Sequence, residues 1–197
     1  MANIATTTFK VLGSRKAVND LWATLQQMEV NSKNIWLGDL AKHYGIDYEA
    51  KHIMVRGSIY WAEYEEDPSN DYYLLSFETE SAWSEPNEIF EEISHLLWDE
   101  LEINYRVTEC GCEVFHVHQE SVYDFFPEEC CVSSYGEPFE EACEDVFETI
   151  GDAINEWCTK MGIEQGERTN DEMVDFINSY EYEDCDTYFY INPFTFD

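Results

Sequence analysis

Between residues 6 and 119 the hydrophobic pattern alternates between the two-residue period of a strand and the 3.6-residue period of a helix. The pattern predicts strands at 6–12, 51–64, 72–79, 101–107 and 112–119. It predicts helices at 14–28 and 85–98, with a short helix and a loop within 34–47. This order of β-α-β-β-α-β with an added hairpin strand predicts a ferredoxin-like α+β fold, an antiparallel sheet with two helices on one face.

Short polar signals mark where these elements begin and end. Gly13 ends the first strand, and Ser14 is placed to cap the first helix. The segment "DPSND", residues 67–71, predicts a turn between the second and third strands. Ser84 is placed to cap the second helix, with Pro86 near its first turn. The two strands on either side of the turn should therefore pair as a hairpin.

The rest of the chain, residues 121–197, is predicted to be an acidic helical elaboration packed on a domain of residues 1–120. The pattern predicts a helix across 137–157 and a second helix at 170–180. An aromatic strand at 187–196, "TYFYINPFTF", should lie against the domain, since its rings would otherwise be exposed. We also expect the tyrosines to belong to the core, together with three tryptophans: Trp36, Trp61 and Trp83.

The net charge of −33 is the property in which this sequence differs most from an ordinary protein, and the charge is segregated along the chain. Residues 1–62 carry +2, whereas residues 63–197 carry −35. Such a field repels nucleic acid and anionic membranes and attracts basic proteins. We therefore expect a basic partner protein, with no direct nucleic-acid binding and no membrane association.

The composition also indicates a folded protein of the cytosol. Hydrophobic residues make up 44% of the chain, which excludes a disordered acidic tail. No apolar run approaches the length needed to span a bilayer, and no signal-peptide pattern is present. The cysteines number seven and lie between Cys110 and Cys185, which favours reduced thiols over a closed disulfide framework. We expect a cytoplasmic location.

The segment "EPFEEACEDVFETIGDAINEW", residues 137–157, concentrates eight acidic side chains and no basic one. On a helix it would hold six acidic pairs four residues apart, each costing about 0.2–0.5 kcal/mol. A basic partner would relieve this repulsion, whereas a solvated surface kept soluble by charge is the alternative. The candidate partner-binding residues, called the acidic set below, are Glu137, Glu140, Glu141, Glu144, Asp145, Glu148, Asp152 and Glu156.

Two segments resemble the YubB ferredoxin-like family, also called Api92-like. They are "LLSFETESAWSEPNEIFEEIS", residues 74–94, and "LEINYRVTECGCEVF", residues 101–115. The chain departs from the family at its opening and before the second hairpin strand. The resemblance implies the ferredoxin-like fold and an origin on a phage, plasmid or other mobile element, and it implies no reaction. The matching positions are Phe77, Thr79, Ala82, Trp83, Ser84, Pro86, Tyr105, Glu109 and Gly111.

The best candidate metal cluster lies in "CGCEVFHVH", residues 110–118. Its Cys110, Cys112, His116 and His118 share one face of an extended strand, although alternate strand residues lie about 7 Å apart and converge poorly. We expect no metal and no other cofactor. The paired cysteines Cys130 and Cys131 are expected to be buried and inert. No catalytic motif is present, so the sequence predicts a protein that is not an enzyme.

Together these features predict an interaction protein that inhibits a nucleic-acid-binding enzyme. Carboxylates on a helix face lie about 5–6 Å apart, of the same order as phosphates along a nucleic-acid strand. Given the mobile-element resemblance, the predicted target is the basic channel of a host defence nuclease, a CRISPR effector first and a restriction enzyme second. The alternatives are a binding module for another basic protein, an acidic surface without mimicry, and a metal-dependent enzyme.

Overall fold

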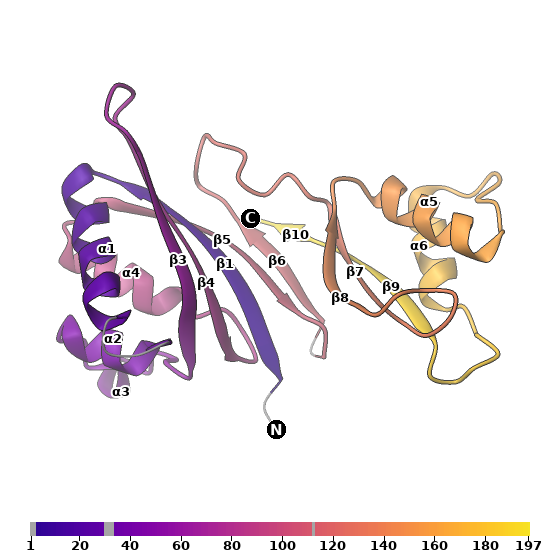
Figure 1. Ribbon diagram of the computed structural model, residues 1–197, viewed down its shortest axis with the longest axis horizontal. Coiled ribbons are helices and arrows are strands. Elements are labelled where there is room, and N and C mark those ends of the chain that lie inside the picture. Colours follow the sequence, from indigo (N-terminus) through magenta and orange to yellow (C-terminus); the bar gives the residue numbers. More distant parts are fainter. Residues whose placement is uncertain (1–2, 30–33, 112) are drawn as a thin grey trace. The chain divides into compact units, whose positions relative to one another are not determined.

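A computed structural model describes residues 3–29, 34–111 and 113–197, with the side chains of residues 143 and 144 left out. The chain divides into two compact units, which are described separately (Figure 1). Unit 1 comprises Met1–Phe125 with Phe196–Asp197, and unit 2 comprises Phe126–Thr195.

Unit 1 contains the N-terminal strands and helices. In chain order they are β1 (Ile4–Gly13), α1 (Arg15–Glu29), β2 (Ile35–Trp36), α2 (Leu37–His43), α3 (Tyr48–Lys51), β3 (Gly57–Asp67), β4 (Tyr72–Ala82), α4 (Asn87–Leu96), β5 (Leu101–Glu109) and β6 (Val114–His118), joined at the sheet edge by β10 (Thr195–Phe196).

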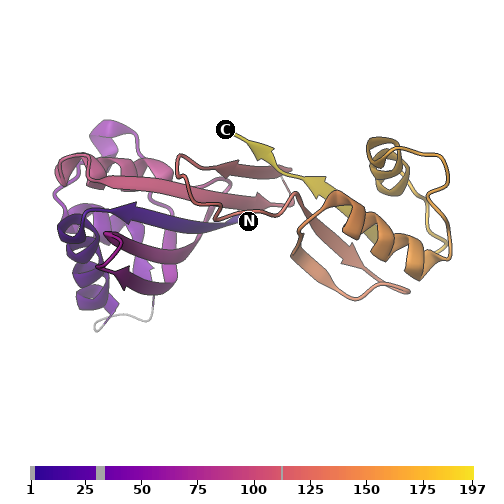
Figure 2. The same ribbon diagram turned by 90° about the horizontal axis from the view of Figure 1, so that it is seen from above.

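The strands of unit 1 form one sheet in the order β10-β6-β5-β1-β4-β3-β2. Central strand β1 runs antiparallel to both neighbours, with Phe9 opposite Phe77 of β4 and Tyr105 of β5. Strands β3 and β4 form an antiparallel hairpin. Helices α1 and α4 lie on the same side of this sheet (Figures 1 and 2). The α+β class and a mostly antiparallel sheet are therefore confirmed.

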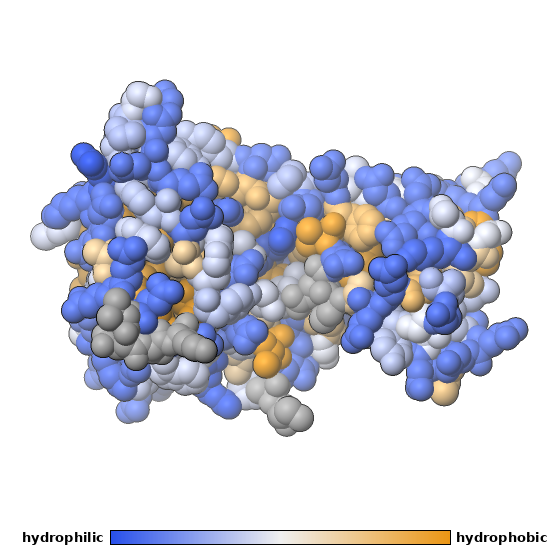
Figure 3. Space-filling model, in the orientation of Figure 1, coloured by the Kyte–Doolittle hydropathy of each residue, from blue (hydrophilic) through white to orange (hydrophobic). Residues whose placement is uncertain are grey.

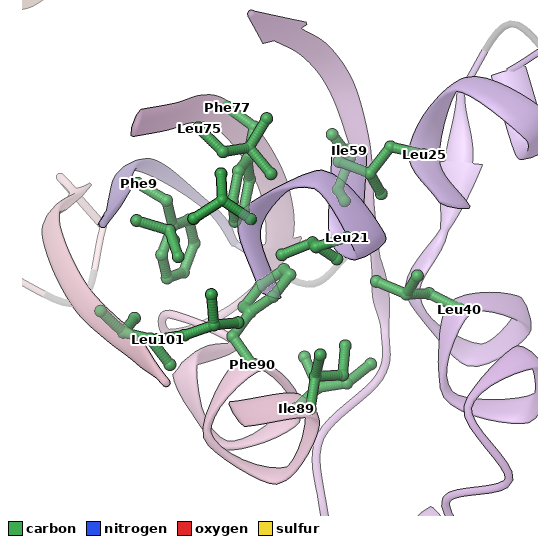
Figure 4. Close-up of a cluster of buried hydrophobic side chains, with 14 of the residues drawn as sticks. Phe9, Leu21, Leu25, Leu40, Ile59, Leu75, Phe77, Ile89, Phe90 and Leu101 are labelled. Atoms are coloured by element: carbon green, nitrogen blue, oxygen red, sulfur yellow. The ribbon is translucent and has the colours of Figure 1, made fainter. Parts of the chain in front are cut away.

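The core of unit 1 lies between the helices and the sheet (Figure 4). Alternate residues of β1 face it, because side chains on a strand point to opposite sides in turn. The rings of Phe9, Phe77 and Phe90 meet with centroids 4.7–4.8 Å apart, and Tyr105 lies 5.6 Å from Phe9. These four aromatic side chains join three strands to α4.

Several predicted details of unit 1 are confirmed and others are wrong. Ser14 caps α1 as predicted, since its Oγ accepts a hydrogen bond of 3.2 Å from the Ala17 amide. The strand predicted from residue 51 begins only at Gly57, because Asp47 caps the short helix α3. Ser84 does not cap α4, whose first flanking residue is Pro86. Trp36, Trp61 and Trp83 are 43–48% exposed and do not belong to the core.

Unit 2 is a three-stranded antiparallel sheet with two helices, so the predicted helical elaboration with one aromatic strand lacked two strands, β7 and β8. The strands are β7 (Cys130–Tyr135), β8 (Ala142–Phe147) and β9 (Tyr188–Pro193), in the order β8-β7-β9. The helices are α5 (Ile150–Met161) and α6 (Asn170–Asn178). The predicted second helix and aromatic strand correspond to α6 and β9.

One sheet face of unit 2 packs against both helices. Val132, Phe189 and Ile191 from the sheet form a core with Trp157 of α5 and Met173 of α6. Trp157 is fully buried, and its indole N–H donates a hydrogen bond of 2.8 Å to the Tyr182 hydroxyl. Each unit therefore has a hydrophobic core of its own.

Candidate protein-binding surface

The acidic set lies entirely in unit 2, but not on one helix. Three of its members precede β8, and Glu144 and Asp145 lie within that strand. Glu148 follows the strand, and only Asp152 and Glu156 lie in α5. The predicted helix across 137–157 is therefore wrong, and of the six predicted helical pairs only Asp152/Glu156 exists. Every member with a described side chain is exposed, except Glu156, which is half-buried.

Residues 142–147 form a strand because they pair with β7. Cys130 lies opposite Phe147, and Cys131 lies opposite Val146. The preceding loop is anchored by Phe139, which is buried and packs its ring against Phe189 and Tyr182. These contacts join residues distant in the sequence, so local spacing did not reveal them. The acidic side chains around β8 thus project from a loop and a sheet edge.

Helix α5 begins at a capping interaction that the sequence contains. Thr149 Oγ1 accepts a hydrogen bond of 3.1 Å from the Asp152 amide and donates one of 2.7 Å to the Asp152 carboxylate. The Glu129 carboxylate accepts a further hydrogen bond, of 2.8 Å, from the Ile150 amide. Negative charge is stabilising at a helix N-terminus. Part of the acidity around α5 therefore has a structural role.

Replacing Thr149 with alanine should destabilise unit 2 by about 1 kcal/mol, because the cap of α5 is lost. The measurement is urea unfolding of the full chain, with amide hydrogen exchange reporting on α5. Thr159→Ala is the matched control, since Thr159 is exposed within the same helix and caps nothing. Equal stabilities of the two variants would show that the Thr149 cap contributes nothing measurable.

Unit 2 has a higher density of negative charge than unit 1. Residues 126–195 hold 19 acidic side chains and two basic ones, Lys160 and Arg168, for a formal charge of −17. Lys160 is already paired with Glu156 at 3.2 Å, and the Arg168 guanidinium lies over the Phe176 ring. In Figure 3 hydrophilic residues cover most of the visible face. The basic side chains of this unit therefore leave most of its acidic charge unneutralised.

The two histidines of the candidate metal cluster lie together at the edge of the unit 1 sheet. His116 Nε2 lies 3.0 Å and His118 Nδ1 2.9 Å from the same Asp197 carboxylate oxygen. Partial burial raises the pKa of Asp197, but the His118 hydrogen bond and the charges of both histidines lower it below its ordinary value. The arrangement holds β10 beside β6.

The predicted four-residue metal cluster is not tested, because Cys112 lies outside the described residues. Among the residues that the structure describes, Cys110, His116 and His118 do not form a group of three converging ligands. Within the described part of the chain, one group brings three such ligand atoms within 4.8 Å of one another, namely Asp184, Cys185 and Asp186. All three are exposed, and the Asp186 amide N–H donates a hydrogen bond of 3.1 Å to the Asp184 carboxylate, as in a turn.

A cleft of about 320 Å³ lies between α4 and strands β5 and β6. Leu101, Ile103 and Tyr105 form its apolar part, whereas His95 and His118 are among its polar residues. The carboxylate of Asp99 hydrogen-bonds His95 and raises the pKa of that imidazole. Burial and neighbouring carboxylates raise the pKa of Tyr105. Both histidines are thus held by carboxylates, at His95–Asp99 and His118–Asp197.

The paired cysteines at the start of β7 are buried as predicted. Burial, followed by the charges of Glu129 and Asp152, raises the pKa of the Cys130 thiol to about 12. A thiol with such a pKa is protonated at neutral pH, and the thiolate is the reactive form. This environment disfavours redox chemistry at Cys130.

No family model, curated protein or solved structure matches this chain. The resemblance to the YubB family therefore remains a prediction. Across the described residues, no helix is both long enough and apolar enough to cross a bilayer.

Proposed function

We propose that this protein is an inhibitor from a mobile element that binds the basic nucleic-acid channel of a host defence nuclease. A CRISPR effector is the first candidate target and a restriction enzyme the second. The protein acts in the cytoplasm of a bacterial host by occupying the channel, without catalysis and without a cofactor. Unit 1 is proposed to be a ferredoxin-like domain of the YubB type, on the strength of its β5-β1-β4-β3 order with α1 and α4 on one face.

The observation that carries the proposal is the exposed, largely unneutralised charge of unit 2. Its formal charge of −17 far exceeds the magnitude of about 2–8 that keeps a small domain soluble. Carboxylates on a loop and a sheet edge present negative charge over an area rather than along one helical line. A basic channel built for phosphates offers the complementary charge and would be reached at an enhanced rate.

The experiment measures inhibition of DNA cleavage by a panel of purified CRISPR effectors and restriction enzymes. We expect the full chain to inhibit at least one of them, with added DNA competing against it and with inhibition weakening at higher salt. An absence of inhibition across the panel, or inhibition that salt and DNA leave unchanged, would contradict the proposal.

Replacing Glu137, Glu140 and Glu141 with Gln and Asp145 with Asn should weaken binding to the inhibited nuclease at least about fivefold. Exposed ion pairs contribute about 0.2–1 kcal/mol each, so four of them contribute about 1–4 kcal/mol. Folding should be unaffected, because these side chains are exposed. Affinity is measured by calorimetry at two salt concentrations.

The matched control removes four exposed carboxylates from unit 1, by Glu49→Gln, Glu63→Gln, Glu65→Gln and Glu88→Gln. It changes net charge by the same amount, so a general charge effect weakens both variants equally. A loss confined to the unit 2 variant assigns the contact to the acidic set. If both variants bind as tightly as the unchanged chain, the acidic side chains do not contribute to this contact and serve only to keep the protein soluble.

A further inference from the structure

The face of the unit 2 sheet opposite its helices carries three stacked tyrosines. Tyr135 of β7 lies opposite Tyr188 of β9, and their ring centroids are 6.3 Å apart at an interplanar angle of 24°. Tyr190 continues the row, with its centroid 5.4 Å from that of Tyr188 at 21°. We call these three residues the tyrosine ladder.

The rings of the ladder are exposed although they occupy regular strand positions. Tyr135 and Tyr190 are each 45% exposed and Tyr188 is 37% exposed. The alternate residues Phe189 and Ile191 point to the other face and are fully buried beneath the helices. The expectation that the tyrosines belong to the core is therefore wrong for this row. A continuous aromatic surface remains accessible in unit 2.

In the amino-acid sequence, exposed carboxylates lie within a few residues of the ladder tyrosines Tyr135 and Tyr188. Glu137 follows Tyr135 after a single glycine, and Asp186 precedes Tyr188 by two residues. Glu141 directly precedes β8, whose Ala142 is the register partner of Ser134. Glu137 and Glu141 belong to the acidic set. Aromatic rings and negative charge thus occur at the same end of this sheet, the carboxylates in the loops that adjoin its strands.

We propose that the tyrosine ladder and its flanking carboxylates bind arginine side chains of the basic partner. This inference rests on the proposed function and names the chemistry by which that partner is recognised. A guanidinium is planar, stacks on an aromatic face and pairs with carboxylates through a fork of N–H donors. Tyrosine and arginine are also the residues in which binding energy is commonly concentrated at protein interfaces.

Arginine fits this surface better than lysine or an apolar group. The ammonium of lysine is a strongly hydrated point charge that gains less from a ring face. An apolar partner would lose the charge complementarity of a unit that carries −17. Cross-strand tyrosine pairs also stabilise a sheet. The test must therefore separate binding from folding.

The experiment compares nona-arginine with nona-lysine as binding probes for the full chain, by fluorescence anisotropy at low salt. Both peptides carry the same charge, so charge alone binds them equally. We expect the arginine peptide to bind at least about threefold more tightly, because only guanidinium groups stack well on the ladder. The variant Tyr188→Thr/Tyr190→Thr should lower the ratio of the two affinities to about one and leave nona-lysine binding nearly unchanged.

Two control variants make the result specific. Tyr188→Phe/Tyr190→Phe keeps the ring faces and should keep the arginine preference. Tyr123→Thr removes a tyrosine of unit 1 that is 46% exposed and should also keep it. Threonine favours strands, so the Thr variant retains a residue suited to β9. If it nevertheless fails to fold, the Phe variant still decides: loss of the arginine preference in that folded variant overturns the proposal.

The remaining outcomes are distinct. An arginine preference that persists in the folded Thr variant overturns the role of the ladder but leaves the proposed function standing. Absence of salt-dependent binding of either peptide contradicts the proposed function and this inference together. Self-association of the chain that disappears in the Thr variant identifies the ladder as an interface between copies, and it too overturns the arginine site.

Discussion

Replacing Trp157 with alanine should unfold unit 2 while leaving unit 1 folded. Trp157 is fully buried at the centre of the unit 2 core, where its ring contacts those of Phe176 and Tyr180. Its indole N–H also bonds the Tyr182 hydroxyl, which would lose this partner. Truncating a buried Trp costs about 3–5 kcal/mol, and a core of about 70 residues rarely supplies more than that.

The measurement is hydrogen exchange followed residue by residue in the full chain, together with urea unfolding. Amides of β7, β9, α5 and α6 should lose protection, and those of β1, β4 and β5 should keep it. Trp98→Ala is the control, because Trp98 is 80% exposed and its loss should change stability by no more than about 0.5 kcal/mol. Cooperative loss of both units in the Trp157 variant would contradict the independence of the two cores.

The sequence allowed much of unit 1 to be predicted because its elements have regular periods and one buried face. β1 buries alternate residues, and α1 buries Val18, Leu21 and Leu25 at helical spacing. Because the residues that become buried recur at the period of the strand or helix, these elements can be predicted from local sequence alone. The small element α3 was missed because four residues are too few to establish a helical period.

The acidic segment was mispredicted because its apolar residues fit two structures. Phe139, Val146, Ile150 and Trp157 recur at spacings compatible with a helix, yet the first two precede α5, in a loop and in β8. Pairing of β8 with β7 is a contact that no local period encodes. The sequence does contain a signal for the true start of the helix. Thr149 lies three residues before Asp152, a pattern typical of a helix N-terminus.

The candidate surface was predicted only in part, for a related reason. Charge is readable from composition, so the acidic set and its exposure could be anticipated. The tyrosine ladder depends on the register between β7 and β9, and the sequence shows only that tyrosines alternate in one of these strands. The shared Asp197 contact of His116 and His118 likewise depends on where the distant strand β10 lies.

Replacing Phe90 with alanine should destabilise unit 1 by about 3–5 kcal/mol without unfolding it at room temperature. Phe90 is buried on α4, and its ring lies 4.7 Å from that of Phe77 and 4.8 Å from that of Phe9. Its removal leaves a cavity at the contact between the helix and the centre of the sheet.

The different expectation for the two cores follows from their sizes. Native domains are stable by about 0.05–0.15 kcal/mol per residue, which for the 125 residues of Met1–Phe125 gives about 6–19 kcal/mol. Unit 1 therefore keeps a positive stability after the loss, whereas the core of unit 2, with about 70 residues, rarely supplies more than the loss itself. Leu96→Ala on the same helix is the control, since Leu96 is 52% exposed and its truncation opens no cavity. Urea midpoints measure the effect, and equal midpoints for the Phe90 and Leu96 variants would show that the aromatic cluster does not join α4 to the sheet.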